Sequence, residues 1–211
     1  MASRHYSFGD RLLTEFDTAL RVVATKPRAA RSCPDAETVE LPAAESRLSA
    51  SLMRVNHAGE IAAQALYRGQ ALVARDPELR ANLLEAAEEE HDHLAWCDNR
   101  SRQLNSRVSL LTPAWYAGSF AIGAVAGLAG DKISLGFLAE TERQVTAHLE
   151  SHLERLPAED KNSRAIIKQM REDEIKHGQN ATERGGQELP EAVKKAMRAA
   201  AKVMTSLSFR L

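Results

Sequence analysis

Two copies of a Glu-x-x-His motif constrain the fold of this 211-residue chain more than any other feature of its sequence. The copies are Glu90 with His93 and Glu174 with His177. In a helix, side chains three positions apart stand on one face, so each copy presents a carboxylate next to an imidazole. The residue seven positions before each motif glutamate lies on the same face and is aliphatic, which indicates that this face points into a core.

A further glutamate precedes each copy at a similar distance. Glu60 comes 30 positions before Glu90, and Glu142 comes 32 positions before Glu174. A carboxylate buried alone in an apolar core either finds a partner or gives up its charge, because the low dielectric penalises the ionised form. Four inward carboxylates therefore require bound cations.

The ligand set of four-helix di-iron carboxylate proteins is one Glu from each of two helices and Glu-x-x-His from each of two others. We therefore predict an all-α, ferritin-like four-helix bundle that holds two iron ions. Carboxylates and imidazoles suit iron or manganese, and the chain has no clustered cysteines for zinc or an iron–sulfur centre. The predicted metal ligands are Glu60, Glu90, His93, Glu142, Glu174 and His177.

The same glutamate-rich segment holds an overlapping copy of the motif, Glu88 with His91. A shift of 84 positions carries Glu90 and His93 onto the second copy, together with the aliphatic residue that precedes each. The overlapping copy has no such counterpart. We therefore predict that Glu88 and His91 are a solvated pair or lie outside the direct ligands.

Composition favours one helical domain. Aromatic residues make up 5% of the chain and glycine occurs 11 times, which suits helices better than short strands. The formal net charge is −1, so no overall field attracts nucleic acid. The two cysteines, Cys33 and Cys97, are far apart in the sequence and indicate a reduced, intracellular protein.

Hydrophobic periodicity divides the chain into an N-terminal amphipathic segment with a linker, residues 1–48, and a ferritin-like di-iron domain, residues 49–211. The N-terminus has no apolar run suited to a signal peptide. Prolines at 27, 34 and 42 predict a mobile linker over residues 25–46. Helices are predicted over about 49–76, 77–104, 131–156, 158–182 and 190–207, with a further helix from Thr112.

Residues 108–130 form an uncharged run of 23 positions with four glycines. A helix of about 20 apolar residues can span a bilayer. One crossing here would put the two pairs of ligand helices on opposite sides of the membrane. We therefore predict a hydrophobic crossover helix that lies in the membrane interface and packs through Gly123 and Gly127. A purely buried connecting helix is the alternative.

The last predicted helix is basic and amphipathic, with Val193 and Met197 on one side and several lysines on the other. Such an extra C-terminal helix is typical of a membrane-surface contact. A solvated basic face packed on the bundle is the alternative. Together with the crossover helix, it predicts a peripheral membrane protein on the cytoplasmic face of the bacterial inner membrane.

Four segments around the predicted ligands have a recognisable sequence. They are Arg54-Val-Asn-His-Ala-Gly-Glu60 with Tyr67-Arg-Gly-Gln70, Glu90-His-Asp-His93-Leu, Glu142 with His148, and Glu172-Asp-Glu174-Ile-Lys-His177. Together they resemble the demethoxyubiquinone hydroxylase family, and the likeness covers about residues 49–183.

The resemblance implies a di-iron monooxygenase of ubiquinone biosynthesis, a 3-demethoxyubiquinol 5-hydroxylase that inserts one oxygen atom from O2 into the ring of a polyprenyl quinol. It implies the same six metal ligands. An external reductant is required, for which NADH is a candidate, although no dinucleotide fingerprint is present. Other ubiquinone-biosynthesis proteins are expected partners. The quinol tail length, the donor, iron or manganese loading and the formation of a homo-oligomer stay open.

The chain departs from the family at one position near the predicted site. Family members often have a tyrosine after the histidine that corresponds to His148, and here the residue is Leu149. A relay of electrons through a phenol at this position is therefore in doubt. His148 could support a metal ligand, or it could be an ordinary hydrogen-bonded histidine.

Three other functions share these features. A ferritin-like protein would oxidise or store iron, and a rubrerythrin-like protein would reduce peroxide with the same ligands. A lipid-binding protein with structural glutamates would hold no stoichiometric metal. The long apolar run fits the soluble shell of a ferritin poorly, because such an assembly has no membrane to face.

Overall fold

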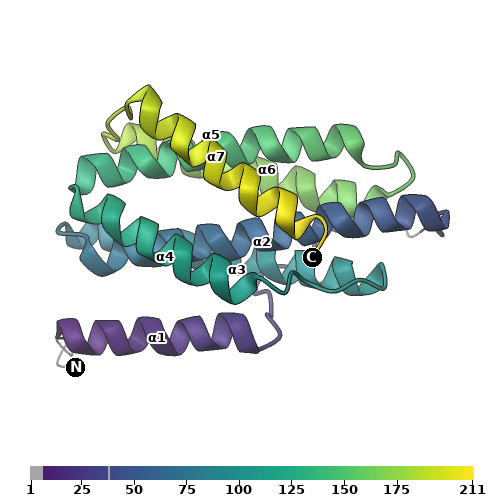
Figure 1. Ribbon diagram of the computed structural model, residues 1–211, viewed down its shortest axis with the longest axis horizontal. Coiled ribbons are helices and arrows are strands. Elements are labelled where there is room, and N and C mark those ends of the chain that lie inside the picture. Colours follow the sequence, from purple (N-terminus) through teal and green to yellow (C-terminus); the bar gives the residue numbers. More distant parts are fainter. Residues whose placement is uncertain (1–6, 38) are drawn as a thin grey trace.

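The computed structural model describes residues 7–37 and 39–211, and within these ranges every regular element is an α-helix. The predicted all-α class is therefore confirmed. Residues 1–6 of the predicted amphipathic segment lie outside the described residues. The helices in Figure 1 are α1 (Phe8–Ala24), α2 (Ala43–Val73), α3 (Pro77–Gln103), α4 (Thr112–Leu128), α5 (Asp131–Arg155), α6 (Lys161–Glu183) and α7 (Glu191–Ser208).

Capping residues set several helix boundaries. The Asp76 carboxylate accepts a hydrogen bond from the Glu78 N–H at the start of α3, where Pro77 is the first helical residue. Asp160 caps α6 through the Ser163 N–H, so that helix begins three residues after the predicted start at Ala158. In contrast, α2 begins directly after Pro42, six residues earlier than predicted.

Helices α2, α3, α5 and α6 form the four-helix bundle, with α2 against α3 and α5 against α6. Two apolar clusters fill its two ends. One cluster contains Leu52, Met53, Trp96, Cys97, Leu149, Leu156, Ile166, Ile167 and Met170. The other contains Ala63, Tyr67, Ala71, Leu79, Leu83, Ala87, Leu135, Leu138 and Ala181. On every bundle helix the predicted ligands fall between the two clusters, so apolar side chains exclude water from both sides of the site.

The crossover helix α4 packs closely on the outside of α2. A Cβ atom at Gly123 would collide with the backbone of Leu66, and one at Gly69 would collide with the Phe120 carbonyl. Only glycine permits this approach of two backbones. The opposite face of α4 is open, since Ile122, Val125 and Leu128 are exposed. The helix is therefore not buried within this chain.

No helix in the described part of the chain is both long enough and apolar enough to cross a bilayer. Helix α4 has 17 residues. Helices α4 and α7 lie in one layer over the bundle, α4 on α2 and α7 on α2 and α5 (Figure 1). The predicted crossover helix and extra C-terminal helix are both present in this layer.

Helix α1 lies along α2 and α4 (Figure 1). Its apolar stripe is turned outward. Glu15 is buried and pairs with Arg68 of α2 at 3.3 Å, which fixes the orientation of the helix. The exposed stripe consists of Phe8, Leu12, Leu13, Phe16 and Leu20. A helix that turns this many large apolar side chains away from its own domain presents an interaction surface.

Residues 30–37 of the linker pack on the bundle, and we call this segment the strap. The Ala30 N–H donates to Asp92 at 2.6 Å, and the Ala36 N–H donates to Asn162 at 2.8 Å. The strap therefore runs from α3 to the start of α6. The prediction of a mobile linker is wrong for these residues, because hydrogen bonds to two bundle helices hold them in place.

Candidate metal centre

The six predicted ligands converge in the middle of the bundle and form two overlapping clusters. Within each cluster the ligand atoms lie within 4.8 Å of one another. One cluster consists of Glu60, Glu90, His93 and Glu174. The other consists of Glu90, Glu142, Glu174 and His177. Glu90 and Glu174 belong to both clusters, so each would contribute to holding both metal ions.

Both histidines turn Nδ1 toward the carboxylates. His93 Nδ1 lies 3.1 Å from Glu90 Oε2 and 3.3 Å from Glu174 Oε1. His177 Nδ1 lies 3.3 Å from Glu174 Oε2 and 3.4 Å from Glu90 Oε1. A neutral imidazole binds metal through the nitrogen that carries no proton. Nδ1 is therefore the nitrogen available for a metal ion in each half of the site.

Two further carboxylates contact the outer nitrogens of these histidines. Asp173 Oδ2 lies 3.2 Å from His93 Nε2, and Glu89 Oε2 lies 2.6 Å from His177 Nε2. A carboxylate that accepts the outer N–H fixes the tautomer and orientation of a metal-binding histidine. Glu89 and Asp173 were not among the predicted site residues. The 84-position shift relates them to each other and was the signal that could have identified them.

The buried Glu142 carboxylate shows that a cation fits the site. Neither of its oxygens accepts a hydrogen bond from any residue in the ranges 7–37 and 39–211. Burial and the neighbouring Glu174 raise the pKa of Glu142 well above its ordinary value in the metal-free protein. A polar group left unpaired in this way is costly unless a ligand satisfies it. Hard oxygen donors and imidazole nitrogens match iron or manganese.

The structure also places the residues that the sequence left in doubt. Glu88 pairs with Arg68 on the surface, and His91 faces Gln64, so both lie outside the two clusters. The His148 ring lies tilted against the His152 ring, with the ring centroids 4.0 Å apart. The buried Nε2 of His148 has no hydrogen-bond partner among the described residues, so the structure gives no contact through which it would support a ligand. Leu149 is part of an apolar cluster.

The stability of the folded, metal-free protein should depend on pH. Burial raises the pKa of Glu60 in the metal-free protein. Burial lowers the pKa of His177, but hydrogen bonds to Glu174 and Glu90 outweigh it and raise that pKa to about 12. The folded state then holds protons that the unfolded chain loses. The free energy of unfolding therefore falls as the pH rises above about 4.5 for Glu60 and above about 6.5 for His177, and each loss continues up to the raised pKa.

We expect chelation of the metal to lower the melting temperature, and the metal-free melting temperature to fall further as the pH rises above about 6.5. Thermal unfolding followed by circular dichroism at several pH values measures both effects. The metal-loaded protein serves as the control, because bound metal has already displaced these protons. A melting temperature unchanged after verified metal removal would contradict a buried carboxylate cluster.

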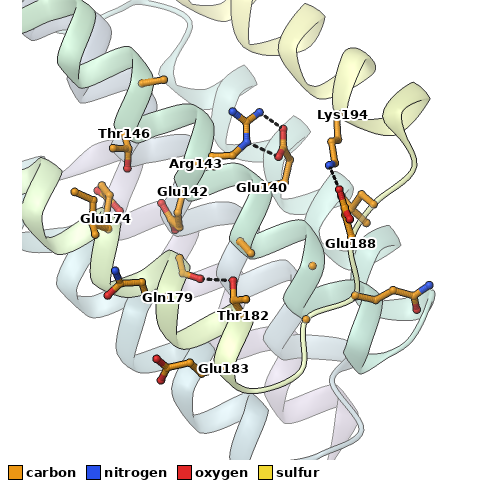
Figure 2. Close-up of a pocket in the computed structure, with 18 of the residues that line it drawn as sticks. Glu140, Glu142, Arg143, Thr146, Glu174, Gln179, Thr182, Glu183, Glu188 and Lys194 are labelled. Atoms are coloured by element: carbon orange, nitrogen blue, oxygen red, sulfur yellow. Dashed lines mark hydrogen bonds and ion pairs between the residues drawn. The ribbon is translucent and has the colours of Figure 1, made fainter.

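A cavity of about 820 Å³ opens beside the site, between α5, α6 and the first turn of α7. Its wall includes Glu142 and Glu174, together with the small residues Ala139, Ala147 and Gly178. Figure 2 shows both glutamates on one side of the cavity and the Lys194–Glu188 ion pair at the other. Its size lies within the range of small-molecule binding sites.

The bundle and its ligand pattern define the ferritin-like class of carboxylate-bridged di-metal proteins. Within that class, the chain belongs to the ubiquinone biosynthesis protein COQ7 family, whose model matches residues 47–208. This finding confirms the resemblance seen in the sequence.

Three relatives illustrate the similarity, and each carries the name 3-demethoxyubiquinol 3-hydroxylase. The protein of Ralstonia pickettii (strain 12J) is 57% identical over 96% of this chain and 99% of its own length. That of Polynucleobacter necessarius is 57% identical over 96% of this chain and 98% of its own length. That of Acinetobacter baumannii is 54% identical over 99% of this chain and the whole of its own length.

Proposed function

We propose that this protein is a di-iron monooxygenase that hydroxylates the ring of a polyprenyl demethoxyubiquinol in ubiquinone biosynthesis. The observation that carries the proposal is the pair of overlapping carboxylate and histidine clusters beside an open cavity, in a chain of this family. The relatives' name numbers the hydroxylated ring carbon 3, whereas we numbered it 5 from the family resemblance.

Two iron ions held by the six residues would supply the oxidising power that converts a ring C–H into C–OH with one atom of O2. The second oxygen atom leaves as water after it takes up two protons and two electrons. An external reductant must provide those electrons, and NADH is our candidate. The protein contributes position, exclusion of water and control of protons.

The residues around the centre have separate tasks. Glu142 and Glu174 form the boundary between the cavity and the site, so a ring in the cavity lies next to these carboxylates. Asp173 and Glu89 hold the outer nitrogens of the two histidines. The apolar clusters at either end keep bulk water away, which strengthens the electrostatic interactions inside the site.

Iron storage and peroxide reduction use the same ligands, and the family assignment favours the hydroxylase over both. A cavity that reaches Glu142 and Glu174 from the surface suits an organic substrate better than a mineral. Turnover of peroxide without any quinol would instead support the rubrerythrin-like alternative.

Lipid extraction from cells that lack the protein tests the proposed reaction. We expect a quinone without one ring oxygen to accumulate, and the wild-type gene to restore the normal quinone. The purified iron-loaded protein, supplied with reductant and isotopically labelled O2, should place labelled oxygen in a short-tailed demethoxyubiquinol. Normal quinone in the deleted cells would contradict the proposal.

Filling the cavity should impair use of the quinol without releasing metal. Thr146 lies one helical turn after Glu142 and lines the cavity. We expect Thr146→Trp to lower kcat/KM for the quinol by about 10-fold or more, chiefly through KM, because loss of apolar contact costs about 1–3 kcal/mol. Steady-state kinetics and iron analysis measure the effect. Glu154→Trp, at an exposed site further along α5, is the matched control.

We further propose that the protein is bound peripherally to the cytoplasmic face of the bacterial inner membrane. The support is the exposed apolar stripe of α1 together with the open face of α4, since the two helices are in contact. An amphipathic helix lies in the membrane interface with its apolar face buried. A polyprenyl quinol stays in the bilayer, so an enzyme that uses it benefits from this position.

A further inference from the structure

Arg31 of the strap reaches the metal centre from outside the bundle. Its Nε lies 2.8 Å from Asp92 Oδ2, and its Nη1 lies 2.9 Å from Asp173 Oδ2. Its guanidinium also lies 5.0 Å from the centroid of the Trp96 ring. One side chain therefore joins α3 to α6 through two buried carboxylates and an aromatic face, a geometry that a planar guanidinium suits.

The carboxylate that Arg31 holds is the one that orients a predicted ligand. Asp173 Oδ2 contacts both Arg31 Nη1 and His93 Nε2, so the strap arginine is one carboxylate away from His93. Arg31 Nη2 itself lies 3.2 Å from His93 Nε2. The His93 ring is fully buried and lies 5.3 Å from the Trp96 ring, between centroids.

The other half of the site has no such arrangement. Glu89 holds His177 Nε2, yet the Glu89 side chain is 44% exposed. No lysine or arginine in the described ranges pairs with it. Each histidine thus has a carboxylate at its outer nitrogen. Asp173 is buried and bound by Arg31 of the strap, whereas Glu89 is open to solvent.

We propose that Arg31 is a positioning residue that holds the His93 half of the metal centre, so that the N-terminal strap is a working part of the site. The proposal rests on the proposed function only in requiring two bound metal ions. Without the guanidinium, Asp92 would lose its basic partner, and Asp173 would keep Lys176, whose Nζ lies 3.3 Å from Asp173 Oδ1. The two buried carboxylates would then repel each other, and Asp173 Oδ2 would turn away from His93 Nε2 toward Lys176. His93 would then lose its fixed orientation, while His177 would keep its own partner.

Titration of the metal-free protein with Co²⁺, followed by visible absorption and calorimetry, tests this proposal. We expect the wild type to bind two ions. Arg31→Gln should weaken one of the two sites by about 10-fold or more, the usual effect of losing an outer-shell partner, and leave the other within about twofold. Arg31→Lys should restore part of the affinity, because lysine keeps the charge but lacks the planar set of donors that binds both carboxylates at once. Arg28→Gln, an exposed arginine of the linker, is the matched control.

Proton NMR of the Co²⁺-loaded protein distinguishes positioning from general stability. Each bound histidine has one exchangeable N–H, and the N–H of His93 is the more shielded. We expect Arg31→Gln to speed exchange of that signal and leave the His177 signal unchanged. The proposal would be overturned if Arg31→Gln bound both Co²⁺ ions with wild-type affinity, or if it lost the same affinity at both sites. Wild-type protein that binds no metal would instead overturn the proposed function.

Discussion

Glu174→Ala should yield a folded protein that retains less than one iron per chain and has no measurable hydroxylase activity. Glu174 belongs to both ligand clusters, so its loss removes a donor from each metal position. Removing an outer-shell partner typically costs about 10–100-fold in metal affinity, and loss of a shared ligand should exceed that range. Iron analysis after gel filtration and turnover of a short-tailed quinol measure the two effects.

Glu88→Ala is the matched control for that substitution. Glu88 stands two positions from ligand Glu90, but its side chain is 68% exposed and pairs with Arg68. The buried Arg68 keeps Glu15 as a partner when the exposed Glu88 carboxylate is removed, so this variant should keep its iron and its activity. Full iron content and full activity in Glu174→Ala would show that the ligands were assigned wrongly.

Local signals predicted most of the fold. The start of α3 and the break before it were predictable because Asp76 and Pro77 act on the backbone beside them. The early start of α2 was missed because its first turn has no apolar periodicity, although Leu48 packs against the core. Tertiary packing extends that helix beyond what the sequence pattern alone indicates.

The candidate ligands were predictable because charges that recur on an apolar helix face need a partner inside the core. The outer partners were harder to find. Asp173 stands beside Glu174 in a charged stretch, and only the 84-position shift that relates it to Glu89 distinguishes it from its charged neighbours. Arg31 is 142 positions from Asp173 and lies in a linker with no periodic pattern. Contacts of this kind depend on where the linker folds back onto the bundle, which a single sequence does not indicate.

The direction of the α1 apolar stripe also needed the structure. An amphipathic pattern shows that one face is apolar, and the default expectation turns that face toward the core. Here the side of α1 that faces the bundle carries Glu15, which pairs with the buried Arg68, and Val22, which packs in a small apolar cluster. The apolar side therefore faces outward, next to the open face of α4.

Ile122→Asp in α4 and Leu13→Asp in α1 should each release the protein from membranes while leaving iron bound. Both side chains are exposed, and neither belongs to the buried clusters of the bundle. Burying one such side chain in an apolar phase contributes about 1.5–3 kcal/mol, so each substitution should lower the vesicle partition coefficient by about 10-fold or more. Phe120 is unsuitable, because it stacks on Tyr116 and packs beside buried residues.

Co-sedimentation with phospholipid vesicles measures this partition, and Val39→Asp, an exposed aliphatic position in the linker, is the matched control. The two released variants should lose activity on a long-tailed quinol in vesicles and keep it on a short-tailed, water-soluble quinol, because α1 and α4 contribute no predicted ligand. Unchanged sedimentation would contradict a membrane contact at this face. If the substitutions instead convert an oligomer into monomers without affecting vesicle binding, the face joins copies of the chain.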